Sequence, residues 1–339
     1  MQTAQNLCKY RSADWRVGRV SISGLAFLAP MSGVSDLAMR RIALRFGAGL
    51  APTEMVACDS FLAGTSEARL RADGEAVTPH VVQIVGHDIA AMRRAALLAE
   101  ETGADIIDIN MGCPAKRVAG ALAGSALMRD LDRASRIIET VVAAVSTPVT
   151  VKMRLGWDQA NCNAAELAAR AEGAGAAMLT VHGRTRQQFY EGRADWAAIR
   201  RIVDAVTIPV VANGDCAGIA DAAAMLAASG AKAVMIGRAA IGEPWLVGQV
   251  SRGLATGAPP ADISASLRLA SAREHFEFLV GTMGAYVGLR HARKHLSAYA
   301  QKAGAPEPVR LALVTAREVA EVRALLDRAF DFGDRQEAA

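Results

Sequence analysis

A regular alternation of short apolar segments with helical patterns dominates the chain between residues 25 and 236. Helical patterns lie between most of the apolar segments, at residues 89–102, 133–145, 164–173 and 219–228. Strands that are apolar on both faces belong in a parallel sheet buried between helices. The predicted strands cover residues 25–28, 50–54, 81–85, 106–110, 149–154, 178–182, 210–213 and 233–236. Their number favours a closed (β/α)8 TIM barrel over an open doubly wound sheet.

The length of the chain agrees with this fold and leaves room for a second domain. A barrel of this kind needs about 250 residues, and the chain has 339. Residues 255–261 contain a glycine and two prolines, which mark a linker. We therefore expect an N-terminal extension at 1–20, a barrel domain at 21–255, a helical domain at 262–332 and a frayed tail at 333–339.

The composition indicates a cytoplasmic protein. The sequence contains no run of 18 consecutive apolar residues, so it predicts no transmembrane helix. The N-terminus lacks the apolar core of a signal peptide. The five cysteines are dispersed, without a CxxC pair or a Cys/His cluster. This pattern predicts a reducing compartment and no metal site. The net charge of +4 is mild, and nothing in the sequence indicates a membrane or an obligatory protein partner.

Polar residues follow the carboxyl ends of seven of the predicted strands, where barrel enzymes carry their active sites. The segment 106–118 is the most distinctive of these. Its strand breaks at Asn110-Met-Gly-Cys-Pro114, because Pro114 lacks a donor and restricts the residue before it. Cys113 is thereby presented on a loop at the barrel mouth. The alternative is a small free cysteine packed under that loop.

Two glycine-containing loops predict a phosphate site. Asn213-Gly-Asp215 and Gly237-Arg238 follow strands seven and eight, where barrels of this class often bind phosphate through backbone amides and a following short helix. The alternative for Asn213-Gly-Asp215 is an ordinary turn. Lys152 projects from mid-barrel and is costly to bury without an anion. Reduced flavin mononucleotide (FMN) satisfies both, with its phosphate at these loops and its anionic ring edge near Lys152.

The ordered set of motifs resembles the tRNA-dihydrouridine synthases, and among them the bacterial B type. The resemblance covers about residues 25 to 330, and it extends into the helical domain through Ala292-Arg-Lys-His295. The other motifs are Met111-Gly-Cys-Pro-Ala-Lys116, Leu122-Ala-Gly-Ser-Ala-Leu127, Lys152-Met-Arg154, His182-Gly-Arg-Thr-Arg186, Asn213-Gly-Asp215 and Gly237-Arg-Ala-Ala-Ile-Gly-Glu-Pro-Trp245.

The resemblance implies an enzyme that reduces the C5–C6 double bond of particular uridines in tRNA. NADPH would reduce bound FMN and leave before tRNA binds, and the uridine would be flipped onto the flavin. The residue that matches Cys113 would protonate C5 while hydride reaches C6. Asn110 could contact either flavin or uracil. The other residues that match cofactor-binding positions of the family are Pro30, Met31, Ser32, Gln83, Lys152, His182, Asn213, Gly214, Asp215, Gly237 and Arg238.

Two groups of basic residues are candidates for RNA contact. Arg184 and Arg186 could meet RNA phosphate or could form an exposed solvated pair. In the helical domain no acidic residue occurs between Glu277 and Glu307. A buried stripe is expected at Leu289, Ala292, Leu296, Tyr299 and Ala303. The adjacent face carries Arg290, Arg293 and Lys294, which we expect to contact RNA phosphates unless it is simply a solvated helix face.

Three other functions are compatible with the same residues. An FMN barrel that acts on small molecules, such as a dihydroorotate dehydrogenase or an ene-reductase, shares the phosphate site but does not need a basic helical domain. A phosphosugar-binding barrel without flavin would leave Cys113 incidental. A non-catalytic RNA-binding protein would have no need of Lys152 and Cys113 at a barrel mouth.

Overall fold

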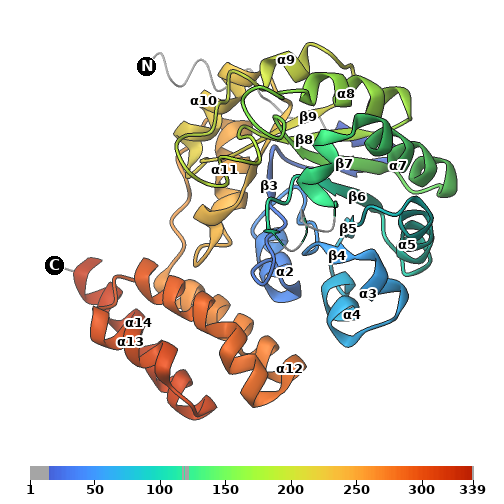
Figure 1. Cartoon of the computed structure of the whole chain (residues 1–339). Coiled ribbons are helices and arrows are strands. Elements are labelled where there is room, and N and C mark those ends of the chain that lie inside the picture. The colour runs from blue at the N-terminus through green and yellow to red at the C-terminus, as the bar shows by residue number, and fades with distance from the viewer. Residues whose placement is uncertain (1–14, 117, 119–121, 338–339) are drawn as a thin grey trace.

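The computed structural model describes residues 15–116, 118 and 122–337, with side chains up to residue 331. The expected N-terminal extension and tail thus fall partly outside the described residues. The core of the molecule is an eight-stranded parallel sheet that curls into a barrel, with helices outside it (Figure 1). This confirms the predicted (β/α)8 fold. The strands are β3 (Ala26–Leu28), β4 (Val56–Ala57), β5 (Val81–Val85), β6 (Ile106–Met111), β7 (Val149–Arg154), β8 (Met178–His182), β9 (Val210–Asn213) and β10 (Ala233–Ile236).

The second strand differs from the prediction. Residues 50–54 are not assigned to a strand, and the short β4 follows them instead. Pro52 explains the difference, because it lacks the N–H that a regular ladder needs. The segment still joins β3 to β5. The amide of Gly49 donates to the carbonyl of Ala26 at 2.9 Å, and the amide of Thr53 donates to the carbonyl of Val81 at 2.9 Å.

Helices surround the sheet and supply the outer half of the main apolar core. Their buried faces are rich in alanine, as on α5, which allows close packing on the strands. These helices are α2 (Leu37–Arg45), α3 (Cys58–Leu62), α4 (Ser66–Ala72), α5 (Ile89–Glu101), α7 (Leu131–Ala144), α8 (Ala164–Gly173), α9 (Arg200–Val203), α10 (Ile219–Ser229) and α11 (Leu246–Thr256). Two short 3-10 helices, η2 (Gly124–Arg129) and η3 (Arg238–Ala240), follow loops at the barrel mouth.

An unpredicted hairpin closes the amino end of the barrel. Strands β1 (Trp15–Val17) and β2 (Val20–Ile22) pair in antiparallel fashion. Trp15 stacks on Phe27 with ring centroids 5.8 Å apart. Their apolar cluster also contains the first residues of several barrel strands, including Val81 and Ile106. The carboxyl ends of the strands lie at the opposite end of the barrel.

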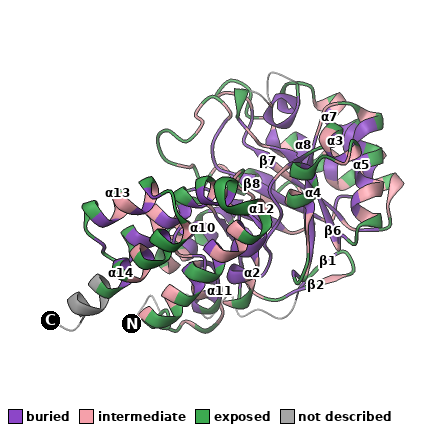
Figure 2. Ribbon diagram, turned by 90° about the horizontal axis from the view of Figure 1, so that it is seen from below, coloured by how far each residue is buried: buried purple, intermediate pink, exposed green. Residues whose placement is uncertain are grey.

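A helical region follows the barrel and lies beside α2 and α11 (Figure 1). It consists of α12 (Ala265–Lys302), α13 (Glu307–Thr315) and α14 (Val319–Glu337), so the last helix extends beyond the expected end at residue 332. Helix α12 is broken at Gly284, whose φ of 75° and ψ of 163° are not helical. The expected stripe is confirmed, because Leu289, Ala292, Leu296, Tyr299 and Ala303 are all buried. The outward faces of these helices are exposed (Figure 2).

The helical region docks on the barrel through aromatic rings and ion pairs. The ring of Trp245 lies 6.0 Å from that of Phe46 and 6.2 Å from that of Tyr299. At the edge of this contact, Arg45 forms an ion pair with Glu274 at 2.7 Å. These contacts join α12 to the barrel through both apolar and polar groups. No helix in the described part of the chain is long and apolar enough to cross a membrane.

Candidate functional site

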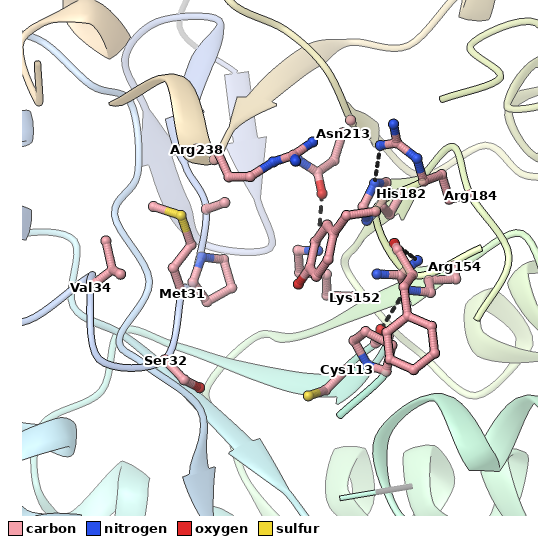
Figure 3. A pocket seen from close by; sticks show the side chains of 18 of the residues that line it. Met31, Ser32, Val34, Cys113, Lys152, Arg154, His182, Arg184, Asn213 and Arg238 are labelled. Atoms are coloured by element: carbon pink, nitrogen blue, oxygen red, sulfur yellow. Dashed lines mark hydrogen bonds between the residues drawn. The ribbon is translucent and has the colours of Figure 1, made fainter. Parts of the chain in front are cut away.

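A pocket of about 810 Å³ opens at the carboxyl ends of the barrel strands. All of the residues predicted to bind cofactor, together with Cys113, line it. Figure 3 shows Cys113, Lys152 and Arg238 arranged around this one cavity. Parallel strands bring these residues together, since each strand ends at the same rim.

A buried carboxylate orients the amides on the floor of the pocket. Asp108 accepts hydrogen bonds from Gln83 Nε2 at 2.6 Å and from Thr150 Oγ1 at 2.6 Å. Gln83 Oε1 then accepts from Asn110 Nδ2 at 2.8 Å. Burial raises the pKa of Asp108, while the hydrogen bonds from Gln83 and Thr150 oppose that rise. Asp108 was not among the predicted site residues, although an acidic residue inside an apolar strand is a visible signal in the sequence.

The loop that carries Cys113 is fixed from both sides. Asn110 Oδ1 accepts the amide of Gly112 at 3.1 Å and that of Cys113 at 2.9 Å. The hydroxyl of Ser125 donates to the carbonyl of Cys113 at 2.8 Å. Gly124 has a φ of +58°, and a side chain there would lie 3.1 Å from the same carbonyl oxygen. The hydrogen bonds to Asn110 therefore fix the backbone of the loop that carries the thiol. Gly124 and Ser125 hold the same loop through their contacts with the Cys113 carbonyl.

The thiol of Cys113 is protonated at neutral pH. Burial raises its pKa, and the nearby charges of Arg154 and Lys152 only partly oppose this. A protonated thiol is able to donate a proton. The same two cations would stabilise the thiolate left behind. The structure thus favours a role at the pocket over the alternative of a packed, inert cysteine.

Lys152 projects into the pocket, and its pKa is lower than that of an exposed lysine. Its Nζ donates to Asn213 Oδ1 at 3.2 Å, and Asn213 Nδ2 donates to the carbonyl of Met235 at 2.9 Å. Burial, together with repulsion from Arg154, lowers the pKa of Lys152 to about 8. An anion bound beside the ammonium group would reverse that shift.

Asp215 holds two arginines at the side of the pocket near β9 and β10. Arg184 donates to both carboxylate oxygens, at 2.9 and 2.5 Å, and Arg238 donates to one of them at 3.1 Å. Arg184 is only 1% exposed. This burial is incompatible with its predicted contact to RNA phosphate, so its role is to hold Asp215 and the rim. Arg238 is 60% exposed, so a ligand in the pocket can contact its guanidinium.

Two aromatic contacts at the rim were not predicted. The exposed ring of Tyr190 lies 5.6 Å from the guanidinium carbon of Arg154 and 5.2 Å from that of Arg238. Arg186 is not in the pocket wall, because its guanidinium lies over the rings of Trp157 and Phe189, at 4.7 Å from each. Tyr190 and Phe189, which both line the pocket, had no sequence signal, since an aromatic residue in a loop has no periodic pattern.

The pocket is strongly electropositive. Among the described residues, its wall carries four cationic side chains and one carboxylate, that of Asp215. Burial and the neighbouring cations, Arg154 first, hold the pKa of His182 well below its ordinary value, so its ring is neutral. The cations are Lys152, Arg154, Arg184 and Arg238. This excess of positive charge favours an anionic ligand.

The basic residues of α12 lie outside the pocket. Arg290 and Arg293 are exposed. Lys294 is exposed as well, and its Nζ donates to the carbonyl of Gly33, the residue after Ser32 in the pocket wall. The basic face of α12 therefore begins at the rim of the pocket.

Comparison with known proteins decides the family. A model of the family described as dihydrouridine synthase (Dus) matches residues 27–332. The chain belongs to this family. The match of a Dus model over barrel and helical region confirms the resemblance inferred from the motifs.

Named relatives of the Dus family support the same assignment. A probable tRNA-dihydrouridine synthase of Rhodobacter capsulatus is 50% identical over 305 residues, which cover 89% of this chain and 94% of that protein. A tRNA-dihydrouridine synthase B of Xanthomonas axonopodis pv. citri is 46% identical, covering 84% of this chain and 86% of the relative. The fold also matches a histamine dehydrogenase from Rhizobium sp. 4-9, with a TM-score of 0.55 at 13% identity over 83% of this chain and 51% of that one.

Proposed function

We propose that the protein is a tRNA-dihydrouridine synthase that uses FMN and NADPH to reduce the C5–C6 double bond of specific uridines in tRNA. The family supports the reaction, and one observation carries its chemistry on this chain. A protonated thiol on a fixed loop shares a pocket with a partly buried lysine and an excess of positive charge.

The pocket fits a flavin nucleotide in size and charge. Its volume of about 810 Å³ falls within the range of about 300–1,000 Å³ that is usual for small-molecule sites. Arg238 and the backbone around Gly214 and Gly237 would hold the phosphate. The carboxylate of Asp215 would act indirectly, by orienting Arg238. The helix η3 has only three residues, so side chains and loop amides rather than a helix terminus would supply most of the attraction.

The amides and the lysine on the pocket floor would hold the isoalloxazine. Gln83 and Asn110 are joined by a hydrogen bond and present one polar edge. Lys152 would stabilise negative charge on the ring, and Pro30, Met31 and Ser32 would contact it as well. When bound and reduced by NADPH, FMN would supply the hydride for C6 of the uracil.

Cys113 would supply the proton. Uracil is a poor hydride acceptor, and a proton donor at C5 avoids a free enolate. The hydrogen bonds to Asn110 and Ser125 fix the Cys113 backbone, so that the thiol meets C5 in one geometry. Arg290, Arg293 and Arg186 would contact the tRNA outside the pocket, which implies a cytoplasmic protein.

The test is dihydrouridine formation by the purified protein. We expect NADPH-dependent dihydrouridine in an unmodified tRNA transcript, detected by nucleoside mass spectrometry, from a preparation that contains FMN. Orotate and simple enones should not oxidise the reduced enzyme at a comparable rate. Rapid oxidation by orotate or an enone, with no product on tRNA, would instead support the small-molecule FMN barrel.

A further inference from the structure

A second polar cluster lies between the barrel and the helical region, outside the mouth pocket. Asp36 begins α2, and its Oδ1 accepts the amide of Met39 at 3.0 Å. Its Oδ2 faces α12, where it lies 3.0 Å from His275 Nε2 and 3.3 Å from His295 Nε2. One carboxylate oxygen of the barrel is therefore surrounded by imidazoles of the helical region.

Two histidines of this cluster have a buried nitrogen without a hydrogen bond of good geometry. His291 and His295 are one turn apart on α12. Within the described part of the chain, His291 Nε2 has no hydrogen-bond partner, and His295 Nε2 has only the Asp36 carboxylate oxygen 3.3 Å away. His295 itself is only 2% exposed. A buried nitrogen without a partner is destabilising, so a ligand that it could bind would relieve that penalty.

The three side chains converge on one point. One ligand atom each from Asp36, His291 and His295 lie within 4.8 Å of one another. Two ligands of one tetrahedral zinc ion, at bond lengths of about 2.0–2.1 Å, are about 3.3–3.4 Å apart. The 3.3 Å between Asp36 Oδ2 and His295 Nε2 matches that spacing, and the ligand atom of His291 lies within 4.8 Å of both.

The three groups are of the types that bind transition metals. Carboxylate oxygens and imidazole nitrogens are common zinc ligands. The buried Arg40 lies nearby, and its guanidinium donates to the carbonyl of Asp73 at 2.5 Å. Its Nε and Nη1 have no hydrogen-bond partner among the described residues.

Surrounding groups provide support and access. The hydroxyl of Tyr299 lies 3.0 Å from His275 Nδ1, which leaves His275 Nε2 to donate to Asp36 Oδ2. Such outer hydrogen bonds orient the ligands of metal sites. A cavity of about 500 Å³ reaches Asp36 and His291 from outside, and Glu54 is among the acids in its wall. That cavity offers a path for a cation and room for a water ligand.

We propose that Asp36, His291 and His295 bind a divalent transition-metal ion of the zinc class, with water as the fourth ligand. Two imidazoles and one carboxylate suit Zn²⁺, whereas Ca²⁺ and Mg²⁺ require oxygen ligands. The ion would join α2 of the barrel to α12 of the helical region and fix the basic face of α12 at the pocket rim. No metal site was expected from the sequence, because it has no CxxC pair or Cys/His cluster, and Asp36 is far from the histidines along the chain. The inference does not depend on the bound flavin.

The test measures zinc binding by the full-length, flavin-containing protein. After treatment with a chelator, titration with ZnCl₂ should show one tight equivalent per chain, and His291→Ala should weaken it at least about 100-fold. Loss of an outer partner alone typically costs 10–100-fold. Co²⁺ should give the visible absorption of a four-coordinate N/O site in the wild type only. The melting temperature should rise with Zn²⁺ in the wild type and not in the variant.

Controls separate this site from adventitious binding and from misfolding. His87→Ala removes a histidine outside the cluster and should change nothing, and all proteins carry Cys162→Ser because that thiol is exposed. His291→Gln keeps a polar side chain of similar length and should retain flavin and helix content while losing the tight site. Equal zinc affinity in the wild type and both His291 variants, or no tight equivalent in the wild type, would overturn the proposal.

Discussion

Positive charge occurs in two different settings in this molecule. In the barrel mouth Lys152 is held among buried side chains, and its pKa falls to about 8. On α12, Arg290 and Arg293 are exposed, and neither has an acidic partner among the described residues. A buried cation that has lost solvation favours one small anion at a fixed distance. Exposed cations favour a long polyanion through counterion release. These preferences support the proposal that the flavin binds in the mouth and that the tRNA backbone contacts α12.

The largest expected effect separates chemistry from binding. Cys113→Ala should lower dihydrouridine formation on tRNA by about 10²–10⁴-fold, the usual contribution of a positioned acid. Flavin content, NADPH oxidation and tRNA affinity should be unchanged. The measurement is single-turnover product formation by the reduced enzyme. Cys162→Ser, at an exposed thiol, is the matched control. Wild-type rates in Cys113→Ala would eliminate the thiol as proton donor.

The second effect concerns the phosphate end of the mouth. Arg238→Ala removes one charge-assisted hydrogen bond, which contributes about 1.5–3 kcal/mol. The Kd for FMN should therefore rise about 10–100-fold, as measured by flavin fluorescence, and added FMN should restore activity. Arg186→Ala changes an arginine that lies outside the pocket and should leave FMN affinity intact. If Arg238→Ala keeps stoichiometric flavin through long dialysis, the phosphate lies elsewhere.

The third effect tests the basic face of α12. Arg290→Glu with Arg293→Glu should weaken tRNA binding about 10–50-fold at 0.1 M salt and reduce the log–log salt slope by close to 2 units. Flavin content and NADPH oxidation should not change. Arg93→Glu with Arg94→Glu makes the same charge change on exposed positions of α5 and serves as control. An equal loss in both pairs would mean that only net charge matters.

The smallest effect follows from the pKa of Lys152. This pKa is about 8 without an anion beside the ammonium group, and a bound anionic flavin would raise it. The affinity for reduced FMN should therefore be constant below pH 8 and fall by up to about tenfold per unit above it. Lys152→Met should bind FMN more weakly at neutral pH and lose this pH dependence. A wild-type affinity that stays flat between pH 7 and 9.5 would show that Lys152 does not sense the flavin.

The strands and the mouth residues could be predicted from the sequence because local patterns specify them. Apolar runs that end in polar residues place Asn110, Lys152 and Asn213 at one end of a parallel sheet, whatever the exact path of the helices. The same reasoning was wrong at residues 50–54, where Pro52 interrupts the ladder. Periodicity also specified the buried stripe of α12, which depends only on the helical repeat.

Burial and long-range pairing were decided by the tertiary structure. From its charge alone, Arg184 was a candidate for RNA contact. In the folded protein its side chain is buried against Asp215. Asp36 and His291 are 255 positions apart in sequence, and only the docking of α12 on α2 brings them within reach of one ion. A local pattern determines which face of a strand or helix a residue occupies. The distance between residues remote in sequence, and the solvation of their charges, depend on how the elements pack.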